Sequence, residues 1–465
     1  MKEGINLMGN IHKFKCKGDY FILDVSSGAI HVVDKIIYDI LSDDGVESRN
    51  DVINNCREKY DKDVLNECYD EIEELIKNEQ LYSEDAYEPI AKNFEKEPDY
   101  TKAVCLNIAH DCNLRCKYCF ADGEGYDKQK ILMSFDVAKR SIDFLIQNSG
   151  SRKNIEVDFF GGEPLLNMEV VKKTVDYARG LEKQLYKKFR FTITTNATLL
   201  TPDIMEYLDK NMVNIVLSID GRKEVQDNIR TKINGDGTYD DILPKIKTMV
   251  QMRHKSKKQY YIRGTFTAQN LDFSKDIKHF IDLGFKEISI EPVVLPADDV
   301  LSIKEEHLEQ IYDEYDKIFD ELLLHDDVIF YHFNIDINGG ACIYKRISGC
   351  GAGFEYTAVT PEGDIYPCHQ FVGNTSFLVG NVFEGIENKV IPGIFRQANI
   401  YRKPDCKKWW ARFYCSGGCQ ANNYNFTGDI KTPYEIGCKM QSKRVEYAIA
   451  LQYYRNNKRA EKNAE

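Results

Sequence analysis

The sequence of 465 residues lacks several features that define whole classes of protein. No apolar run approaches about 18 residues, so we expect no membrane-spanning helix and no membrane partner. The first residues contain no apolar signal-peptide region, which predicts a cytoplasmic protein. A net positive charge is also missing, because 62 lysine and arginine residues are outnumbered by 74 acidic residues and the formal net charge is −12. Duplex nucleic acid is bound by basic surfaces. We therefore expect no nucleic-acid partner.

Cysteine is present in an uneven pattern of 14 residues. Four lie within residues 105–119 and seven within residues 342–438, whereas Cys16, Cys56 and Cys68 are scattered. Disulfides are disfavoured in a chain without an export signal, and clustered cysteines in such a chain favour metal ligation. We expect the three scattered cysteines to be packing residues.

The length predicts about three domains, and the sequence pattern divides the chain accordingly. Residues 1–95 contain a hairpin pattern at 19–33 and helical patterns at 34–42, 50–59 and 63–78. This combination predicts a winged-helix-like domain. Residues 83–100 are polar and contain two prolines, which is typical of a linker.

Strands and helices alternate six times between residues 102 and 330, which predicts an α/β domain with a parallel sheet, a partial (β/α)6 barrel. Right-handed crossovers would place the carboxyl ends of all the strands on one face, where the sites of such folds lie. The predicted strands are 104–109, 155–160, 189–194, 214–219, 260–266 and 287–292.

Residues 335–459 are irregular and rich in glycine, asparagine, cysteine and aromatic residues. We expect only short hairpin-like pieces such as 357–367, no ordinary core, and metal clusters that hold the segment together. A last helix is predicted at about 434–459, followed by a frayed polar tail after Arg459.

The motif that predicts chemistry is C-x3-C-x2-C, formed by Cys112, Cys116 and Cys119 directly after the first predicted strand. Three thiolates on a tight loop would leave one iron of a cubane cluster without a protein ligand, and an open metal position marks a reactive site. A zinc site would need a fourth ligand nearby. Cys105 lies in an apolar run, so we expect it to be a buried strand residue.

This motif, with the aromatic Tyr118 before its last cysteine, resembles that of the radical S-adenosylmethionine (SAM) superfamily. Four further parts of the sequence match the superfamily, although each alone is typical of a strand-to-helix turn or a helix cap. Together they would line one face of the predicted barrel. They are Gly161-Gly162-Glu163-Pro164, which resembles the superfamily's GGEP motif, Thr194-Thr195-Asn196, Ser218-Ile219-Asp220-Gly221, and Arg230.

The resemblance implies SAM and a [4Fe–4S] cluster on Cys112, Cys116 and Cys119 as cofactors. An electron from a donor such as flavodoxin or ferredoxin would split SAM and release a 5′-deoxyadenosyl radical, which would remove a hydrogen atom from the substrate. By the same resemblance, residues 161–164 would contact the SAM amino group, and Tyr118 would pack near its adenine. Arg230 would reach the SAM carboxylate, and further contacts would come from Thr194, Asn196, Ser218 and Asp220.

The later cysteines form the pattern Cys350-x12-Gly363-x4-Cys368, then Cys406-x8-Cys415-x3-Cys419, then Cys438. This pattern resembles the SPASM extension of peptide-modifying radical SAM enzymes, which holds two auxiliary [4Fe–4S] clusters. Trp409 stands where that pattern has a further cysteine, so one auxiliary iron would be open or ligated from elsewhere. A zinc-stabilised thiol cluster is the alternative. The resemblance implies one cluster on Cys350, Cys368, Cys419 and Cys342, and another on Cys406, Cys415 and Cys438.

A hairpin and three helices at the front of such an enzyme resemble the element that binds the leader of a ribosomally made precursor peptide. The alternative is a DNA-binding winged helix. Residues 11–14, 348–353, 367–373 and 414–419 resemble the maturases of SCIFF peptides. That resemblance implies an oxidoreductase that joins a cysteine sulfur to a carbon of another residue in a Cys-rich precursor peptide, giving products of the sactipeptide or ranthipeptide kind.

Other activities stay open at this point. They are formylglycine formation, carbon–carbon cross-linking and epimerisation, or a metal-stabilised peptide-binding scaffold without catalysis. No side chain stands out as the base that deprotonates the donor thiol. His369 and Glu291 are candidates, although the simpler interpretation of each is structural.

Overall fold

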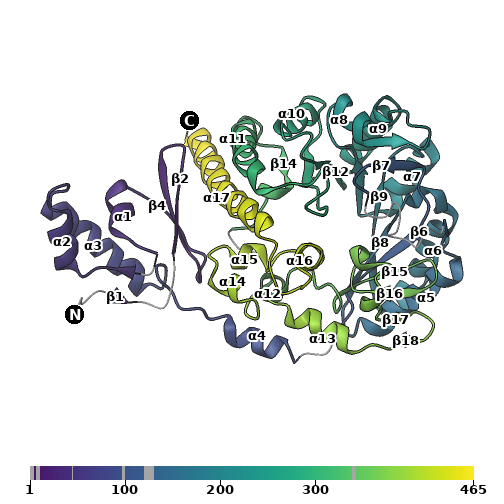
Figure 1. Ribbon diagram of the computed structural model, residues 1–465, viewed down its shortest axis with the longest axis horizontal. Helices are drawn as coiled ribbons and strands as arrows, with labels where there is room; N and C mark the ends of the chain where they lie inside the picture. Colours follow the sequence, from purple (N-terminus) through teal and green to yellow (C-terminus); the bar gives the residue numbers. More distant parts are fainter. Residues whose placement is uncertain are drawn as a thin grey trace.

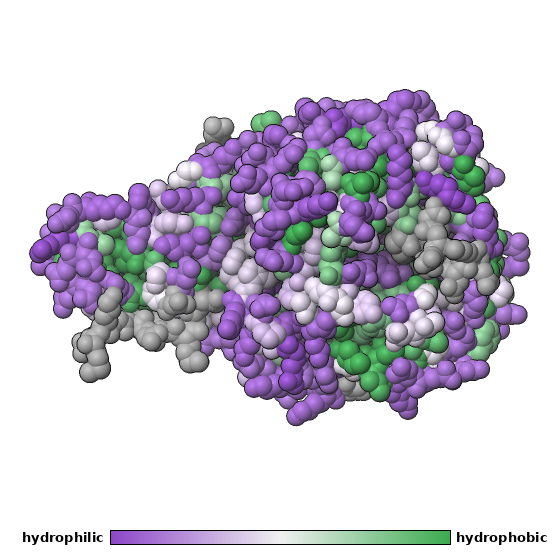
Figure 2. Space-filling view, viewed as in Figure 1, coloured by the Kyte–Doolittle hydropathy of each residue, from purple (hydrophilic) through white to green (hydrophobic). Residues whose placement is uncertain are grey.

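The computed structural model describes residues 5–6, 11–43, 45–96, 100–119, 130–337 and 342–464, so part of the predicted linker lies outside the described residues. A large α/β body adjoins a smaller N-terminal unit, and the connecting segment carries α4 (Glu88–Phe94; Figure 1). Figure 2 shows a largely hydrophilic face on which apolar residues form small patches. In the part of the chain that is described, no helix is long and apolar enough to cross a bilayer.

The N-terminal unit is a three-stranded antiparallel sheet, in the order β2-β3-β4, packed against three helices. The predicted hairpin corresponds to β3 and β4, whereas β2 is a strand that the sequence pattern did not predict. Each helix begins after a residue whose side chain accepts a hydrogen bond from a first-turn N–H: Asp34, Ser48 or Asp61. The elements are β1 (Ile5–Asn6), β2 (Ile11–Cys16), β3 (Asp19–Asp24), β4 (Ile30–Val33), α1 (Lys35–Ile40), β5 (Gly45–Val46), α2 (Arg49–Cys56) and α3 (Lys62–Lys77).

The central body confirms the predicted partial (β/α)6 barrel. Its six main strands are parallel and adjacent in the order β13-β12-β10-β9-β8-β6. They are β6 (Ala103–Ala109), β8 (Asn154–Gly161), β9 (Lys188–Thr195), β10 (Asn214–Ser218), β12 (Gln259–Phe266) and β13 (Glu287–Pro292). The helices between and after them are α5 (Phe135–Asn148), α6 (Met168–Leu185), α7 (Pro202–Asn211), α8 (Lys223–Ile229), α9 (Tyr239–Ser256), α10 (Ser274–Asp282) and α11 (Leu308–Leu324).

Alternation along these strands separates a core face from a cavity face. In β8, Ile155, Val157 and Phe159 are fully buried, whereas Asp158 and Phe160 point the other way and stay partly exposed. The same alternation recurs in β9 and β12. Because successive strand residues point to opposite sides, the apolar set packs under the helices and the polar set is left to line the barrel interior.

The C-terminal region is more regular than the sequence predicts. The predicted hairpin is β15 (Tyr356–Val359) with β16 (Asp364–Tyr366), but β15 also pairs in parallel with β6 and extends the barrel sheet. The expectation of no ordinary core is wrong, because Phe354, Ile365 and Phe395 belong to the same buried cluster as the barrel. Further elements are β14 (Ile329–Phe330), α12 (Ile343–Ser348), β17 (Gly380–Asn381), β18 (Gly385–Ile386), α13 (Val390–Gln397), α14 (Pro404–Lys408), α15 (Arg412–Cys415) and α16 (Gln420–Thr427).

The last helix, α17 (Glu435–Ala464), packs along α11 and reaches β2 of the N-terminal unit (Figure 1). The predicted frayed tail after Arg459 is wrong, because the helix continues to Ala464. Arg455 donates hydrogen bonds to the carbonyl oxygens of Leu322, His325 and Val328, which anchors the last turns to the end of α11.

Candidate functional site

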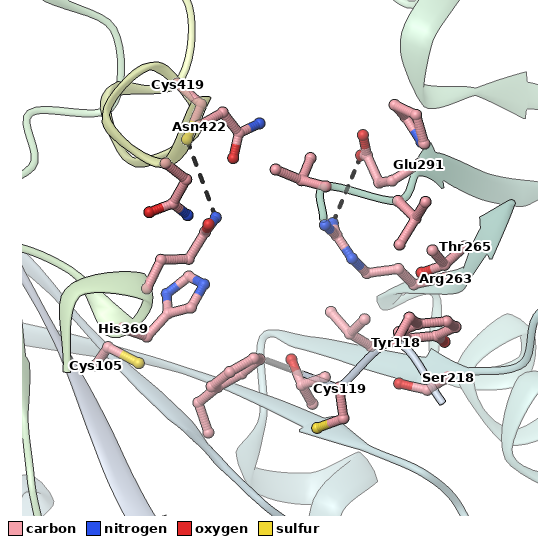
Figure 3. Close-up of a pocket in the computed structure, with 18 of the residues that line it drawn as sticks. Cys105, Tyr118, Cys119, Ser218, Arg263, Thr265, Glu291, His369, Cys419 and Asn422 are labelled. Carbon is pink, nitrogen blue, oxygen red and sulfur yellow. Dashed lines mark hydrogen bonds and ion pairs between the residues drawn. The ribbon is translucent and has the colours of Figure 1, made fainter. Parts of the chain in front are cut away.

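A cavity of about 990 Å³ lies at the carboxyl ends of the barrel strands. Both groups of cysteines reach it. Cys112, Cys116 and Cys119 line one side, and cysteines of the C-terminal region line the other, namely Cys406, Cys415, Cys419 and Cys438. Figure 3 shows Cys419 and Cys119 on opposite sides of the opening, with the side chains of His369 and Arg263 reaching toward it.

The first group of thiols sits on a loop that a short strand pair holds in place. β7 (Leu114–Cys116) pairs antiparallel with β11 (Arg230–Lys232), so that Cys116 and Arg230 are direct partners. Burial raises the pKa of Cys116 to about 12, and Cys119 and Cys112 are close enough to add to the rise. The three motif cysteines are thus gathered at one place.

The GGEP segment packs directly against the backbone of this loop. A side chain at Gly162 would place its Cβ 2.2 Å from the carbonyl oxygen of Asp111, and one at Gly161 would lie 2.3 Å from that of Ala109. Gly161 also has φ +121°, a conformation that favours glycine. The Gly162 N–H donates to the Ala109 carbonyl oxygen at 2.7 Å. Only glycine lets the two segments approach this closely.

Glu163 of the same segment is fully buried and holds the turn from behind. Its carboxylate accepts hydrogen bonds from the Leu165 N–H at 3.0 Å, the Thr195 hydroxyl at 2.7 Å and the Asn196 N–H at 2.7 Å. Asn196 in turn donates to the Asn113 side-chain oxygen at 2.9 Å, next to Cys112. Glu163 therefore links the end of β9 to the cysteine loop.

Tyr118, Asp220 and Arg230 form a hydrogen-bonded network under the loop. The Tyr118 hydroxyl donates to the Asp220 carboxylate at 2.8 Å and accepts a hydrogen bond from Arg230 Nη1 at 2.7 Å. Burial raises the pKa of Asp220 to about 6, and the Arg230 charge opposes that rise. Arg230 Nε is buried and has no hydrogen-bond partner among the described residues. A buried donor of this kind suits an anionic group such as a carboxylate.

The predicted SAM contacts divide into two sets. Seven of them line the cavity: Tyr118, Gly161, Gly162, Thr194, Asn196, Ser218 and Arg230. Glu163, Pro164 and Asp220 do not line it, and Glu163 and Asp220 hold lining residues from behind. Pro164 begins a 3-10 turn, Pro164–Asn167, that leads into α6.

The later cysteines form two triads. Cys350 and Cys419 lie near enough to Cys368 to add to the rise in its pKa that burial causes. Cys406 and Cys438 act in the same way on Cys415, whose pKa burial raises to about 12. The triads contain the cysteines of the two sets that the SPASM resemblance implies, apart from Cys342. Cys342 is exposed, and Trp409 lines the cavity together with Cys406, Cys415 and Cys438.

A buried lysine, Lys403, lies near both triads. Its Nζ donates to the Gly417 carbonyl oxygen at 2.8 Å. Burial lowers the pKa of Lys403, while thiols of both triads act in the opposite direction: Cys406, Cys415, Cys419 and Cys438. A buried cation is costly unless negative charge lies nearby, so its position fits anionic clusters on these thiols.

The donors of the cysteine loop suit a [4Fe–4S] cluster. Within the described ranges, no group of three His, Cys, Asp or Glu side chains converges closely enough to hold one ion. A zinc site would need its ligands about 2.0–2.3 Å from one centre. In a [4Fe–4S] cluster the thiolates bind different irons and stand further apart. The loop thiols, the glycine cradle and the unpaired Arg230 Nε together fit a cluster with SAM.

Sequence reasoning missed several polar residues of the cavity wall, including Asp158, Arg263, Tyr356 and Arg444. Asp158 and Arg263 could have been noticed, because each places a charged side chain within the apolar pattern of a predicted parallel strand. Arg263 forms an ion pair with Glu291 at 3.7 Å across neighbouring strands (Figure 3). Arg444 comes from α17, which no local pattern places beside the barrel.

Comparison with known protein families also points to radical SAM chemistry. Residues 106–272 match the radical SAM superfamily. An uncharacterized protein of Methanocaldococcus jannaschii is 31% identical over 227 residues, which are 48% of this chain and 72% of that protein.

Two solved structures are similar in fold. The structure of anSMEcpe with bound AdoMet and the Cp18Cys peptide has a TM-score of 0.62 at 21% identity, covering 76% of this chain and 99% of that one. Streptococcus suis SuiB bound to the precursor peptide SuiA has a TM-score of 0.52 at 15% identity, covering 93% and 98%. With the cysteine loop and its glycine cradle in place, the family match shows that residues 106–272 of this chain are a domain of the radical SAM superfamily.

Proposed function

We propose that this protein is a radical SAM peptide maturase that joins a cysteine sulfur to a carbon of another residue within a ribosomally made, Cys-rich precursor peptide. The observation that carries the proposal is the shared cavity. The Cys112, Cys116 and Cys119 loop, the triad of Cys406, Cys415 and Cys438, and Cys419 of the other triad border one space, which is large enough for a peptide segment. Hydrogen removal and electron uptake can then act on the same bound substrate.

The residues would divide the work between three groups of thiols. When bound, the cluster and SAM supply a 5′-deoxyadenosyl radical that takes a hydrogen atom from the substrate. Cys112, Cys116 and Cys119 would hold that cluster, and Arg230 Nε offers a donor to the SAM carboxylate. The two later triads would hold two auxiliary [4Fe–4S] clusters, with Cys342 as a further ligand, and Trp409 would leave one auxiliary iron without a thiolate. A flavodoxin or ferredoxin would supply the electron.

The N-terminal unit, within the proposed domain 1–95, would capture the leader of the precursor peptide. Its strand β4 lies at the edge of the sheet and, among the described residues, pairs with β3 alone. The opposite edge strand, β2, is packed against α17. An extended peptide adds most readily to an edge with unpaired backbone groups, so β4 is the strand that the leader would join. The barrel, 102–330, and the SPASM domain, 335–459, would carry out the chemistry.

Hydrogen exchange tests the leader site. We expect the precursor peptide to slow exchange of β4 amides over Ile30–Val33, because new backbone hydrogen bonds would protect them. Strand β2 (Ile11–Cys16) serves as the internal control and should keep its exchange rate. Unchanged exchange in β4 at saturating peptide would contradict this site.

Mass spectrometry of a co-expressed precursor peptide tests the reaction. Each thioether should remove two hydrogens from the peptide and one thiol from the set that an alkylating reagent can label. A loss of two hydrogens with all thiols still reactive would instead indicate carbon–carbon cross-linking, and an unchanged mass would exclude both. Fragment ions on either side of the link identify the acceptor residue.

A further inference from the structure

Joining a thiol sulfur to carbon releases the thiol proton, so the proposed reaction needs a proton acceptor inside the cavity. The acceptor must face the substrate, must lie away from bulk water and must change its protonation state near neutral pH. The sequence alone left His369 and Glu291 as candidates.

The structure disfavours both. Glu291 contacts the His332 ring at 3.2 Å and forms an ion pair with Arg263 at 3.7 Å. These neighbours keep its pKa well below the usual range despite burial, so it is a weak base. His369 directly follows Cys368, an expected cluster ligand, and its Nδ1 is already bonded to the Tyr356 hydroxyl at 3.3 Å.

Asp158 meets the geometric requirements. It lies on β8 in register with Cys105 of β6 and Thr192 of β9, and all three residues line the cavity. Its side chain is partly exposed, on the cavity side of the strand. No described residue forms an ion pair with it, and its hydrogen-bond partner is the Thr192 side chain.

The surroundings of Asp158 set its protonation. Burial raises the pKa of Asp158 to about 7; Glu156 on the same strand adds to the rise, while Thr192 and Lys102 oppose it. The other titratable groups that face it are Cys105 on β6 and Tyr356 on β15. A carboxyl of this kind is present in both forms near neutral pH, which suits a group that takes up and releases one proton per turnover.

We propose that Asp158 is the general base that deprotonates the cysteine thiol of the substrate peptide. This inference rests on the proposed thioether-forming function. The thiol S–H bond breaks and its proton passes to the Asp158 carboxylate. The acceptor C–H bond breaks as its hydrogen atom passes to the 5′-deoxyadenosyl radical, and a sulfur–carbon bond forms. One electron remains, which an auxiliary cluster on the later cysteines would accept.

The pH profile of the wild-type enzyme provides the first measurement. A base with a pKa of about 7 is roughly one-tenth ionised at pH 6 and nine-tenths at pH 8, so cross-linking should rise about tenfold and then level off. If the free thiol ionised without help, its pKa of about 8.5 would give a rise of roughly 70-fold over the same interval, with no plateau below pH 8.5. That second profile would overturn the proposal without any variant.

The variant Asp158→Asn, in the full-length reconstituted enzyme, separates proton transfer from radical formation. It should still produce 5′-deoxyadenosine with the precursor peptide, but cross-link it about 10²–10⁴-fold more slowly at pH 7. Cross-linking should recover above pH 8.5, where the thiol ionises by itself. Asp158→Glu should restore part of the rate at pH 7.

Asp143→Asn is the matched control, because Asp143 lies on α5, bonds Tyr177 and does not line the cavity. It should leave cross-linking unchanged. The proposal would be overturned if the Asp158→Asn enzyme kept the wild-type cross-linking rate and pH profile. It would also be overturned if this variant no longer formed 5′-deoxyadenosine, because that loss would place Asp158 at the SAM site. If the wild-type enzyme forms no thioether at all, the proposed function itself fails, and that outcome is seen before any variant is compared.

Discussion

Cys112→Ala is expected to abolish SAM cleavage by the reconstituted protein. Cys112, Cys116 and Cys119 are the three thiols gathered on the loop, and Cys105 lies on β6 as a buried strand residue with a pKa raised by burial. Without Cys112 the cluster keeps only two protein ligands. We expect 5′-deoxyadenosine formation to fall below detection and the iron content to fall by about four atoms per chain, as for loss of one [4Fe–4S] cluster.

Cys56→Ser is the matched control for this experiment. Cys56 ends α2 in the N-terminal unit, is only partly buried and does not line the cavity. Its replacement should leave both iron content and SAM cleavage at wild-type values. Persistent SAM cleavage in the Cys112→Ala protein would contradict the assignment of this loop as the radical-generating site.

Gly162→Ala is expected to damage the same site without removing a ligand. The added Cβ would lie 2.2 Å from the Asp111 carbonyl oxygen and 3.1 Å from Cys112 Cβ, so the cysteine loop must shift. Overpacking of this kind costs about 1–3 kcal/mol. If this strain destabilises the SAM-bound state, SAM affinity should weaken by about five- to 150-fold. Equilibrium binding of SAM to the anaerobically reconstituted protein measures this change.

Gly180→Ala tests whether the loss comes from steric contact and not from a glycine change in general. Gly180 lies in the interior of α6 on an exposed surface, and a Cβ there meets nothing within 4 Å. Alanine at this position should raise the free energy of unfolding by about 0.5–1 kcal/mol and leave SAM affinity unchanged. Equal SAM affinities for the Gly162→Ala and wild-type proteins would show that the loop tolerates the shift.

Much of the barrel could be predicted from the sequence because its signals are local. The apolar strand residues Ile155, Val157 and Phe159 are buried at the expected alternate positions. Helix α7 begins with Thr201 as its N-cap and Pro202 in its first turn, a common start signal. Such signals act within a few residues and need no knowledge of distant partners.

Strand β2 was missed because its stability comes from contacts distant in sequence. Its residues 11–16 alternate between apolar and charged side chains too weakly to predict a strand alone. In the structure His12 stacks on Trp410 at 3.5 Å between ring centroids and bonds Glu446 at 3.0 Å. Both partners lie more than 390 residues away, so no local pattern could indicate them.

The sequence alone identifies which side chains can bind metal or accept a proton. Which of them lie together is decided by the tertiary packing. Cys112, Cys116 and Cys119 share one loop, so their spacing alone brings the thiols together. The later triads join cysteines from separate turns and helices, and packing of α14, α15, α16 and α17 places Cys406, Cys415, Cys419 and Cys438 around the cavity. Asp158 shows the same division: the sequence supplies a carboxylate, and burial between β6 and β9 changes its pKa to about 7. Burial and proximity depend on the whole fold, because each is produced by residues distant along the chain.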